Sequence, residues 1–161
     1  MSAPARRTWE YATIPLLIHN TKAILDSWGV DGWELVEPLH VGPLTRTYRA
    51  RPVGGPADCP AAYVLKRLRR RWWDVPQAVA MMRREAQLGR TVSHRHLISI
   101  LATGAGSPPH YVVTPWLEGA TLEASLNQRP ILDVPVALWT ARQVAEALDA
   151  LWAAGDRKSV V

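Results

Sequence analysis

The stretch Tyr63-Val64-Leu65-Lys66-Arg67-Leu68 is the part of the sequence from which the fold can be worked out. Its apolar and β-branched residues follow a loop rich in proline and glycine, and this pattern predicts a β-strand. A helix is predicted to begin at Asp74-Val75-Pro76 and to run to about Val92, because Asp74 can act as an N-cap and proline is tolerated in a first turn. The strand therefore leads through a basic turn into a helix.

One charged residue interrupts the apolar stripe of this helix. Glu85 belongs to a series that recurs at helical spacings of three and four residues. Burying an unpaired carboxylate costs several kcal/mol or forces its protonation, so we expect a cation from a neighbouring element to approach it. Lys66, at the end of the predicted strand, is the natural partner. The series consists of Ala78, Met81, Glu85, Leu88 and Val92.

The other segments predict a mixture of strands and helices. Residues 35–52 are expected to form two strands around a turn at Gly42-Pro43, and short strands are expected at 97–101 and 111–116. A short helix is expected around 122–127, and a long one is expected to begin at Asp133-Val134-Pro135 and to end near Gly155. A strand, a helix and a second strand are also expected within residues 9–36.

Composition limits the classes of protein that this chain can belong to. With 161 residues, of which 48% are hydrophobic, it can form one ordinary domain or two small ones with a real core. A single cysteine, Cys59, excludes an internal disulfide framework and a cysteine-based zinc site. No run approaches 18 apolar residues and no hydrophobic signal core follows the N-terminus, so we expect a cytoplasmic protein without a membrane segment.

The strand lysine and the helix glutamate resemble the pair with which protein kinases hold the phosphates of ATP. Tyr63-Val64-Leu65-Lys66 is similar to the kinase third-strand motif, and Glu85 follows Lys66 by 19 residues, a spacing typical of the family. His94-Arg95-His96-Leu97-Ile98 resembles the turn after the kinase C-helix, although the usual proline and asparagine are replaced. The resemblance to bacterial-type serine/threonine protein kinases extends over about residues 35–155.

This resemblance implies an α+β fold: a kinase-like N-lobe, made of an antiparallel sheet and the C-helix, followed by the first long helix of the C-lobe. It implies that Lys66 contacts phosphate, that Glu85 orients Lys66 and that Thr114 is the gatekeeper beside adenine. ATP is the implied cofactor, with Mg²⁺ needed only in the intact parent kinase, and the nucleotide is the implied small-molecule partner. The implied cofactor-binding residues are Lys66, Glu85, Gly42, Val64, Thr114, Pro115, Trp116 and Leu117.

The nucleotide loop departs from the kinase pattern. His40, Gly42 and Thr45 stand where the family has three glycines, so that only Gly42 is retained. Glycines at these places let backbone N–H groups approach phosphate closely. The loop is therefore expected to bind phosphate less well, or differently, and an ordinary hairpin turn is an equal alternative.

The first part of the chain resembles another family. Residues 9–36, which include Trp9-Glu10-Tyr11-Ala12 and Trp28-Gly29-Val30-Asp31-Gly32-Trp33, are similar to the DUF4177 family of small bacterial domains, which brings no activity with it. We therefore expect a DUF4177-like segment at 1–36 and a kinase-like domain at 37–155. Because a two-stranded sheet is marginally stable, the hairpin up to residue 52 could instead complete the first unit.

The end of the sequence lacks the pattern of a catalytic loop. A kinase needs an aspartate beside the substrate hydroxyl, and an asparagine and a second aspartate for magnesium, and none of these can be assigned here. We therefore expect a truncated kinase domain without catalytic competence. Residues 156–161, Asp-Arg-Lys-Ser-Val-Val, resemble the translation of a sequencing adapter, so we interpret them as a non-native tail, which the coding nucleotides would test.

Three other readings of the sequence remain open. The chain could be a non-catalytic interaction module, either DUF4177-like or a pseudokinase, and no motif in it indicates a particular protein substrate. The basic and aromatic segment Lys66–Trp73 could bind the phosphate backbone and bases of a nucleic acid. We favour the alternative that it is a solvated loop whose tryptophans pack back onto the domain. His94 and His96 could bind a metal, but the sequence supplies no third ligand, so a turn is favoured.

Overall fold

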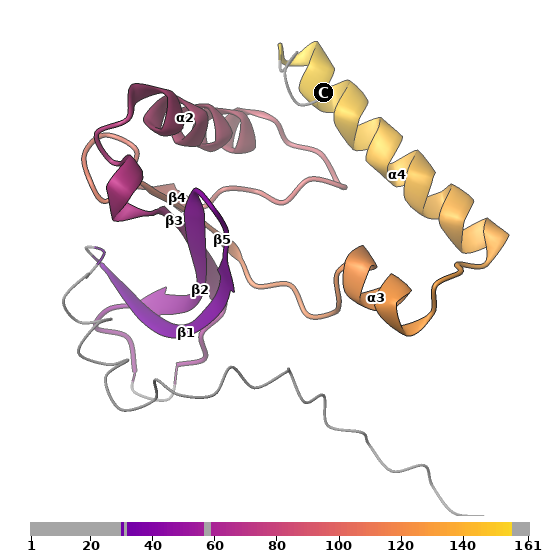
Figure 1. The fold of residues 1–161 in the computed structure, drawn as a ribbon, viewed down its shortest axis with the longest axis horizontal. Coiled ribbons are helices and arrows are strands. Elements are labelled where there is room, and N and C mark those ends of the chain that lie inside the picture. The colour runs from indigo at the N-terminus through magenta and orange to yellow at the C-terminus, as the bar shows by residue number, and fades with distance from the viewer. Residues whose placement is uncertain (1–29, 31, 57–58, 156–161) are drawn as a thin grey trace, which may run out of the picture.

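An antiparallel sheet of five strands, in the order β1-β2-β3-β5-β4, carries the fold (Figure 1). The computed structural model describes residues 30, 32–56 and 59–155. The strand and helix expected within residues 9–29 and the tail 156–161 lie outside these residues. The strands are β1 (Trp33–Val41), β2 (Thr45–Pro52), β3 (Tyr63–Leu68), β4 (Ala102–Thr103) and β5 (Tyr111–Pro115). The helices are η1 (Arg70–Trp72), α2 (Pro76–Thr91), α3 (Leu122–Gln128) and α4 (Val134–Ala153).

The predicted hairpin is confirmed, and it belongs to the same sheet as β3. β1 and β2 flank the turn at Gly42-Pro43, and β2 pairs on its other side with β3. Glu34 and Arg51 join β1 to β2 through hydrogen bonds of 2.8 and 3.0 Å, and the bond from this guanidinium to the carboxylate raises the pKa of Arg51. β1 begins at Trp33, so the boundary expected between residues 36 and 37 falls inside a strand.

Two apolar cores lie on opposite faces of the sheet, because side chains alternate along each strand. Leu65 of β3 packs in the first core, whereas Leu68 packs in the second core against α2. The buried residues of the first core are Val30, Leu35, Tyr48, Ala50, Leu65 and Val113. Those of the second core are Leu68, Ala78, Val79, Met82, Ala86 and Val112.

Helix α2 forms where it was predicted, but a different stripe of it faces the core. Its buried residues are Ala78, Val79, Met82 and Ala86, whereas Met81 is exposed. All five residues from 78 to 82 are apolar, so periodicity alone could not choose between two adjacent stripes. The N-cap is Val75, without a side-chain hydrogen bond, so the prediction of Asp74 as N-cap was wrong.

The prediction of a strand at 97–101 is also wrong, since only Ala102 and Thr103 form β4. The backbone N–H of Ile100 donates to the Gly89 carbonyl of α2, at 3.0 Å, instead of to a neighbouring strand. The segment approaches α2 so closely that a Cβ atom at position 89 would lie 2.6 Å from the Ile100 side chain. Bonding to the helix thus replaces strand pairing at Ile100, and pairing with β5 begins only at Leu101, whose N–H donates to the Val113 carbonyl at 2.8 Å.

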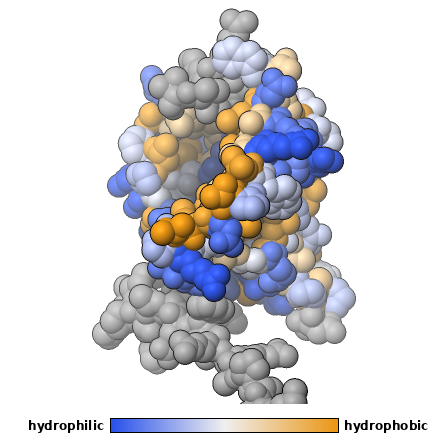
Figure 2. Space-filling view, turned by 90° about the vertical axis from the view of Figure 1, so that its right-hand side faces the viewer, coloured by the Kyte–Doolittle hydropathy of each residue, from blue (hydrophilic) through white to orange (hydrophobic). Residues whose placement is uncertain are grey.

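The two C-terminal helices are confirmed, and α4 leaves many apolar side chains exposed. Thr121 caps α3 by accepting a hydrogen bond from the Ala124 N–H, at 3.1 Å. Figure 2 faces the α4 side of the molecule and shows hydrophobic residues gathered in a diagonal band. None of the helices in the described part of the chain is long and apolar enough to cross a membrane. The large apolar residues of α4 that are exposed are Val134, Val136, Leu138, Trp139, Val144, Leu148 and Trp152.

We predict that Leu65→Ala lowers the free energy of unfolding by about 2–5 kcal/mol, because Leu65 is fully buried at the centre of the first core. Urea denaturation would measure this loss. The matched control is Leu138→Ala on α4, where the side chain is 66% exposed and the change should stay within about 0.5 kcal/mol. Equal losses in the two variants would contradict the core described here.

Candidate functional site

An ion pair joins β3 to α2. The ammonium Nζ of Lys66 lies 2.8 Å from both carboxylate oxygens of Glu85. Strand alternation directs Lys66 to the face of the sheet that α2 covers, where Glu85 projects from the helix. The predicted partner is therefore correct, but the prediction that Glu85 is buried in an apolar stripe is wrong. The Lys66 and Glu85 side chains remain 37% and 43% exposed.

This ion pair lies at the wall of a cavity of about 310 Å³ between the hairpin turn, β3 and α2. The volume is at the lower end of the range of about 300–1,000 Å³ that is typical of small-molecule sites. The cavity combines apolar walls with one amine and one carboxylate, which suits a ligand that has an apolar part and an anionic part. The lining residues are His40, Gly42, Pro43, Leu44, Thr45, Lys66, Leu68, Ala78, Met81, Met82 and Glu85.

The hairpin turn is closed by its own hydrogen bond and is tied to the segment after β3. The Gly42 N–H donates to the Thr45 carbonyl, at 2.9 Å. Arg69 donates to the Gly42 carbonyl at 3.1 Å, and Arg71 and Trp72 donate to the Pro43 carbonyl at 2.8 and 3.0 Å. The turn is therefore held above Lys66, and the Gly42 N–H is already used within it.

The remaining predicted site residues lie beyond the lining of this cavity, and two of them, Val64 and Thr114, share the face of the sheet that carries Lys66. Val64 and Thr114 are opposite one another on β3 and β5. Trp116 follows β5, where its N–H donates to the Ala62 carbonyl at 2.9 Å and its ring lies 4.5 Å from the Arg49 guanidinium. Pro115 is half-buried, whereas Leu117 is 65% exposed. The structure thus brings Gly42, Lys66 and Glu85 together and places the other five further along the sheet.

Two residues of β2 that the sequence analysis did not select share this face. Thr47 is opposite Lys66, and Arg49 is opposite Val64. Arg49 also donates from Nε to the Ala61 carbonyl, at 2.8 Å, so it fixes the segment that leads into β3 beside the Trp116 ring. Alternation along β2 from Thr45 could have identified both residues, because every second side chain points to the same face.

The segment after α2 forms the expected turn. The His96 N–H donates to Nδ1 of His94, at 3.3 Å, and the Leu97 N–H donates to the His94 carbonyl, at 3.0 Å. Nε2 of His96 lies 3.3 Å from the Glu146 carboxylate of α4. A hydrogen bond from Arg142 lowers the pKa of this Glu146 carboxyl. Within residues 30, 32–56 and 59–155, no group of three or more potential metal ligands occurs.

Comparisons with known proteins agree with this geometry. Residues 34–155 match the family model of protein tyrosine and serine/threonine kinases. The chain is similar in fold to the PknI kinase domain of Mycobacterium tuberculosis, with a TM-score of 0.61, 20% sequence identity, and coverage of 78% of this chain and 50% of that chain. Two mutant forms of that domain match with TM-scores of 0.62 and 0.64 at the same identity. The match covers 50% of the first mutant chain and 49% of the second.

The chain therefore spans about half the length of the PknI kinase domains that it matches. At 20% identity, these structures establish the likeness of the fold and not of the activity. No curated protein sequence matches the chain.

We predict that Glu85→Gln lowers the free energy of unfolding by no more than about 1 kcal/mol, because the ion pair is partly open to solvent. Urea denaturation of this variant and of Glu37→Gln, which makes the same charge change at an exposed position of β1, would measure it. A loss of about 3–5 kcal/mol, as expected when a buried pair loses one partner, would contradict the exposure described here.

Proposed function

The chain belongs to the protein tyrosine and serine/threonine kinase family, and from this we propose that it is the nucleotide-binding part of an ATP-dependent serine/threonine kinase of bacterial type. One observation carries the proposal: the Lys66 ammonium is held by both oxygens of Glu85 at the wall of a cavity. A lysine fixed in this way presents a positive charge at a constant place without folding back onto its own strand. That is the requirement for holding an anionic phosphate.

We propose separate roles for the residues along this face. Lys66 contacts a phosphate oxygen of ATP, and Glu85 positions Lys66. Val64 and Thr114, which are opposite one another across β3 and β5, border the adenine ring. The backbone of residues 115–117 faces the adenine edge, and the Arg49 contact with the Trp116 ring supports that segment.

The hydrogen bonding of the hairpin turn leads us to expect a modest affinity for the nucleotide. In the proposed complex the turn around Gly42 covers the phosphates, but the Gly42 N–H is engaged with the Thr45 carbonyl. Lys66 would thus supply the main positive charge that contacts the phosphates. The same observation makes a pseudokinase, which binds nucleotide without transferring phosphate, the second candidate.

Magnesium does not fit the described residues of this chain. Kinases hold Mg²⁺ with an aspartate and an asparagine, and the described residues contain no cluster of potential metal ligands. Asp149 lies within α4, one turn before the end of that helix, and therefore not in a loop. We propose that these residues bind nucleotide and that transfer of phosphate to a protein hydroxyl belongs to the whole kinase.

We predict that ATP in the presence of Mg²⁺ raises the melting temperature of the chain and that Lys66→Ala removes the effect. At about ten times its Kd, a ligand adds about 1.4 kcal/mol to the free energy of unfolding. For a chain of this size, that raises the melting temperature by about 3–6 °C. Thermal denaturation with increasing ATP would measure the shift.

The control is Arg90→Ala, which removes a positive charge from an exposed position of α2 and should retain the full shift. The nucleotide assignment fails if ATP changes nothing in the original chain, or if the shift persists in Lys66→Ala.

A further inference from the structure

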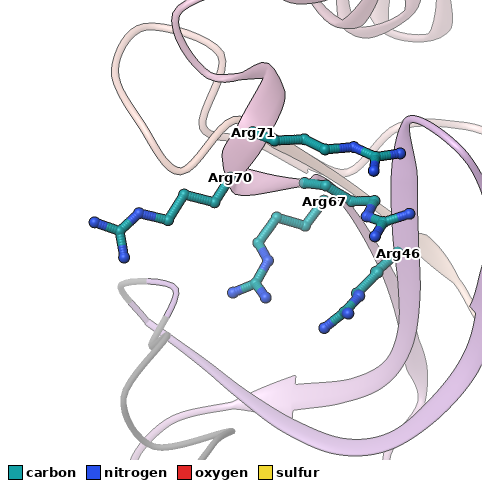
Figure 3. Close-up of a pocket in the computed structure, with 5 residues that line it drawn as sticks. Arg46, Arg67, Arg70 and Arg71 are labelled. Atoms are coloured by element: carbon teal, nitrogen blue, oxygen red, sulfur yellow. The ribbon is translucent and has the colours of Figure 1, made fainter.

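Five arginines line a second cavity, on the face of the sheet opposite Lys66 (Figure 3). Arg46 comes from β2, Arg67 from β3, and Arg69 to Arg71 from the segment that enters and forms η1. Alternation along β3 explains the position, since Arg67 follows Lys66 and points to the other face. The cavity is therefore separate from the proposed nucleotide site.

The register of the sheet places two of these positive charges side by side. Arg46 and Arg67 are directly opposite one another on β2 and β3. Figure 3 shows both side chains extending from their strands to the same side. Like charges in directly opposite positions destabilise a sheet, and an anion held between them would reverse that effect.

The arginines differ in how firmly they are held. Arg67 is 4% exposed, and its guanidinium donates to the Tyr48 hydroxyl at 3.3 Å and lies 5.4 Å from the Tyr48 ring. Arg69 and Arg71 donate to the carbonyls of Gly42 and Pro43, which fixes their side chains while leaving further N–H groups on each guanidinium. Their positions are thus set by the protein before any ligand binds.

Arg46 provides the observation that points to a ligand. Its Nε atom is buried and has no hydrogen-bond partner among the residues that the structure describes. A buried donor without a partner costs about 1–3 kcal/mol, so a ligand that supplies an acceptor there gains binding free energy. The acceptor must be compact, because the cavity of about 150 Å³ is smaller than the roughly 300–1,000 Å³ of ordinary small-molecule sites.

We propose that this arginine cavity, defined by Arg46, Arg67, Arg69, Arg70 and Arg71, binds a phosphate group. The planar fork of a guanidinium matches two phosphate oxygens, and a dianion offsets the repulsion between Arg46 and Arg67. The phosphate is either free inorganic phosphate or the phosphate of a phosphorylated side chain. The cavity lies on the face of the sheet opposite Lys66, so a ligand can occupy it while Lys66 holds a nucleotide.

The test is a titration of the full 161-residue chain with inorganic phosphate at constant ionic strength, followed by thermal denaturation and by the NMR signals of the arginine Nε–H groups. Phosphate should raise the melting temperature and shift the Arg46 signal. Arg46→Gln should weaken phosphate binding about tenfold, the loss expected for one hydrogen bond to a charged group. The control Arg129→Gln, at an exposed position after α3, should bind as the original chain does.

The melting temperature without phosphate distinguishes a ligand-binding arginine from one that only stabilises the fold. Without phosphate, Arg46→Gln should melt at the same temperature as the original chain or above it, because the repulsion with Arg67 is relieved. Arg70→Gln, at an exposed position of the same cavity, provides an independent variant that leaves the core intact and should also weaken phosphate binding. Lys66→Ala should leave phosphate binding unchanged.

A phosphoserine peptide and its unphosphorylated form separate the two sources of phosphate. Tighter binding of the phosphopeptide than of inorganic phosphate would assign the cavity to a phosphorylated chain, and equal binding would assign it to the free ion. The proposal is overturned if phosphate has no effect, or if it acts equally on Arg46→Gln. It is also overturned if Lys66→Ala abolishes binding, or if single-stranded DNA binds with steep salt dependence while phosphate does not.

Discussion

Side chains alternate between the two faces of β3, and the arrangement of the domain depends on this alternation. Leu65 and Arg67 point to one face, and Lys66 and Leu68 point to the other. One short strand therefore contributes to both cores, to the ion pair with α2 and to the arginine cavity. A shift of one residue in the register of β3 would exchange the faces and bury Lys66 in place of Leu65.

The pairing of β3 with β2 and β5 protects this register. β3 is the central strand of the sheet, with β2 on one side and β5 on the other. Both neighbours carry buried residues on matching faces, such as Tyr48 on β2 and Val113 on β5. The position of Lys66 is thus determined by core packing, and the ion pair with Glu85 can remain partly exposed without contributing much to stability.

The sequence predicted those parts of the fold that local patterns encode. Strands β1, β2, β3 and β5, the hairpin turn at Gly42-Pro43 and the three α-helices were found, because apolar periodicity, prolines and turn residues mark them. The pairing of Lys66 with Glu85 was also found, from the expectation that a carboxylate among apolar residues needs a cation. The same reasoning overestimated the burial of Glu85. Residues 78–82 are all apolar, so the sequence did not show that the stripe of Val79, Met82 and Ala86 faces the core instead of the stripe of Met81 and Glu85.

Features that depend on tertiary contacts were not predictable in this way. The segment 97–101 has a strand-like sequence, but the N–H of Ile100 bonds to Gly89 of α2 and only Leu101 bonds to β5. The arginine cavity combines Arg46 with residues more than 20 positions later, so it exists only once β2 pairs with β3. The basic run after Lys66 was visible in the sequence, whereas its opposition to Arg46 required the register of the sheet.

The most direct measurement of the central claim is covalent labelling by an ATP analogue with an acyl group on its terminal phosphate, which transfers that group to a lysine beside the phosphates. The chain has three lysines, Lys22, Lys66 and Lys158, so the labelled position can be assigned by mass spectrometry of peptides. We expect labelling mainly at Lys66 and its suppression by excess ATP. Labelling spread equally over the three lysines, or unaffected by ATP, would contradict the placement of Lys66 in a nucleotide site.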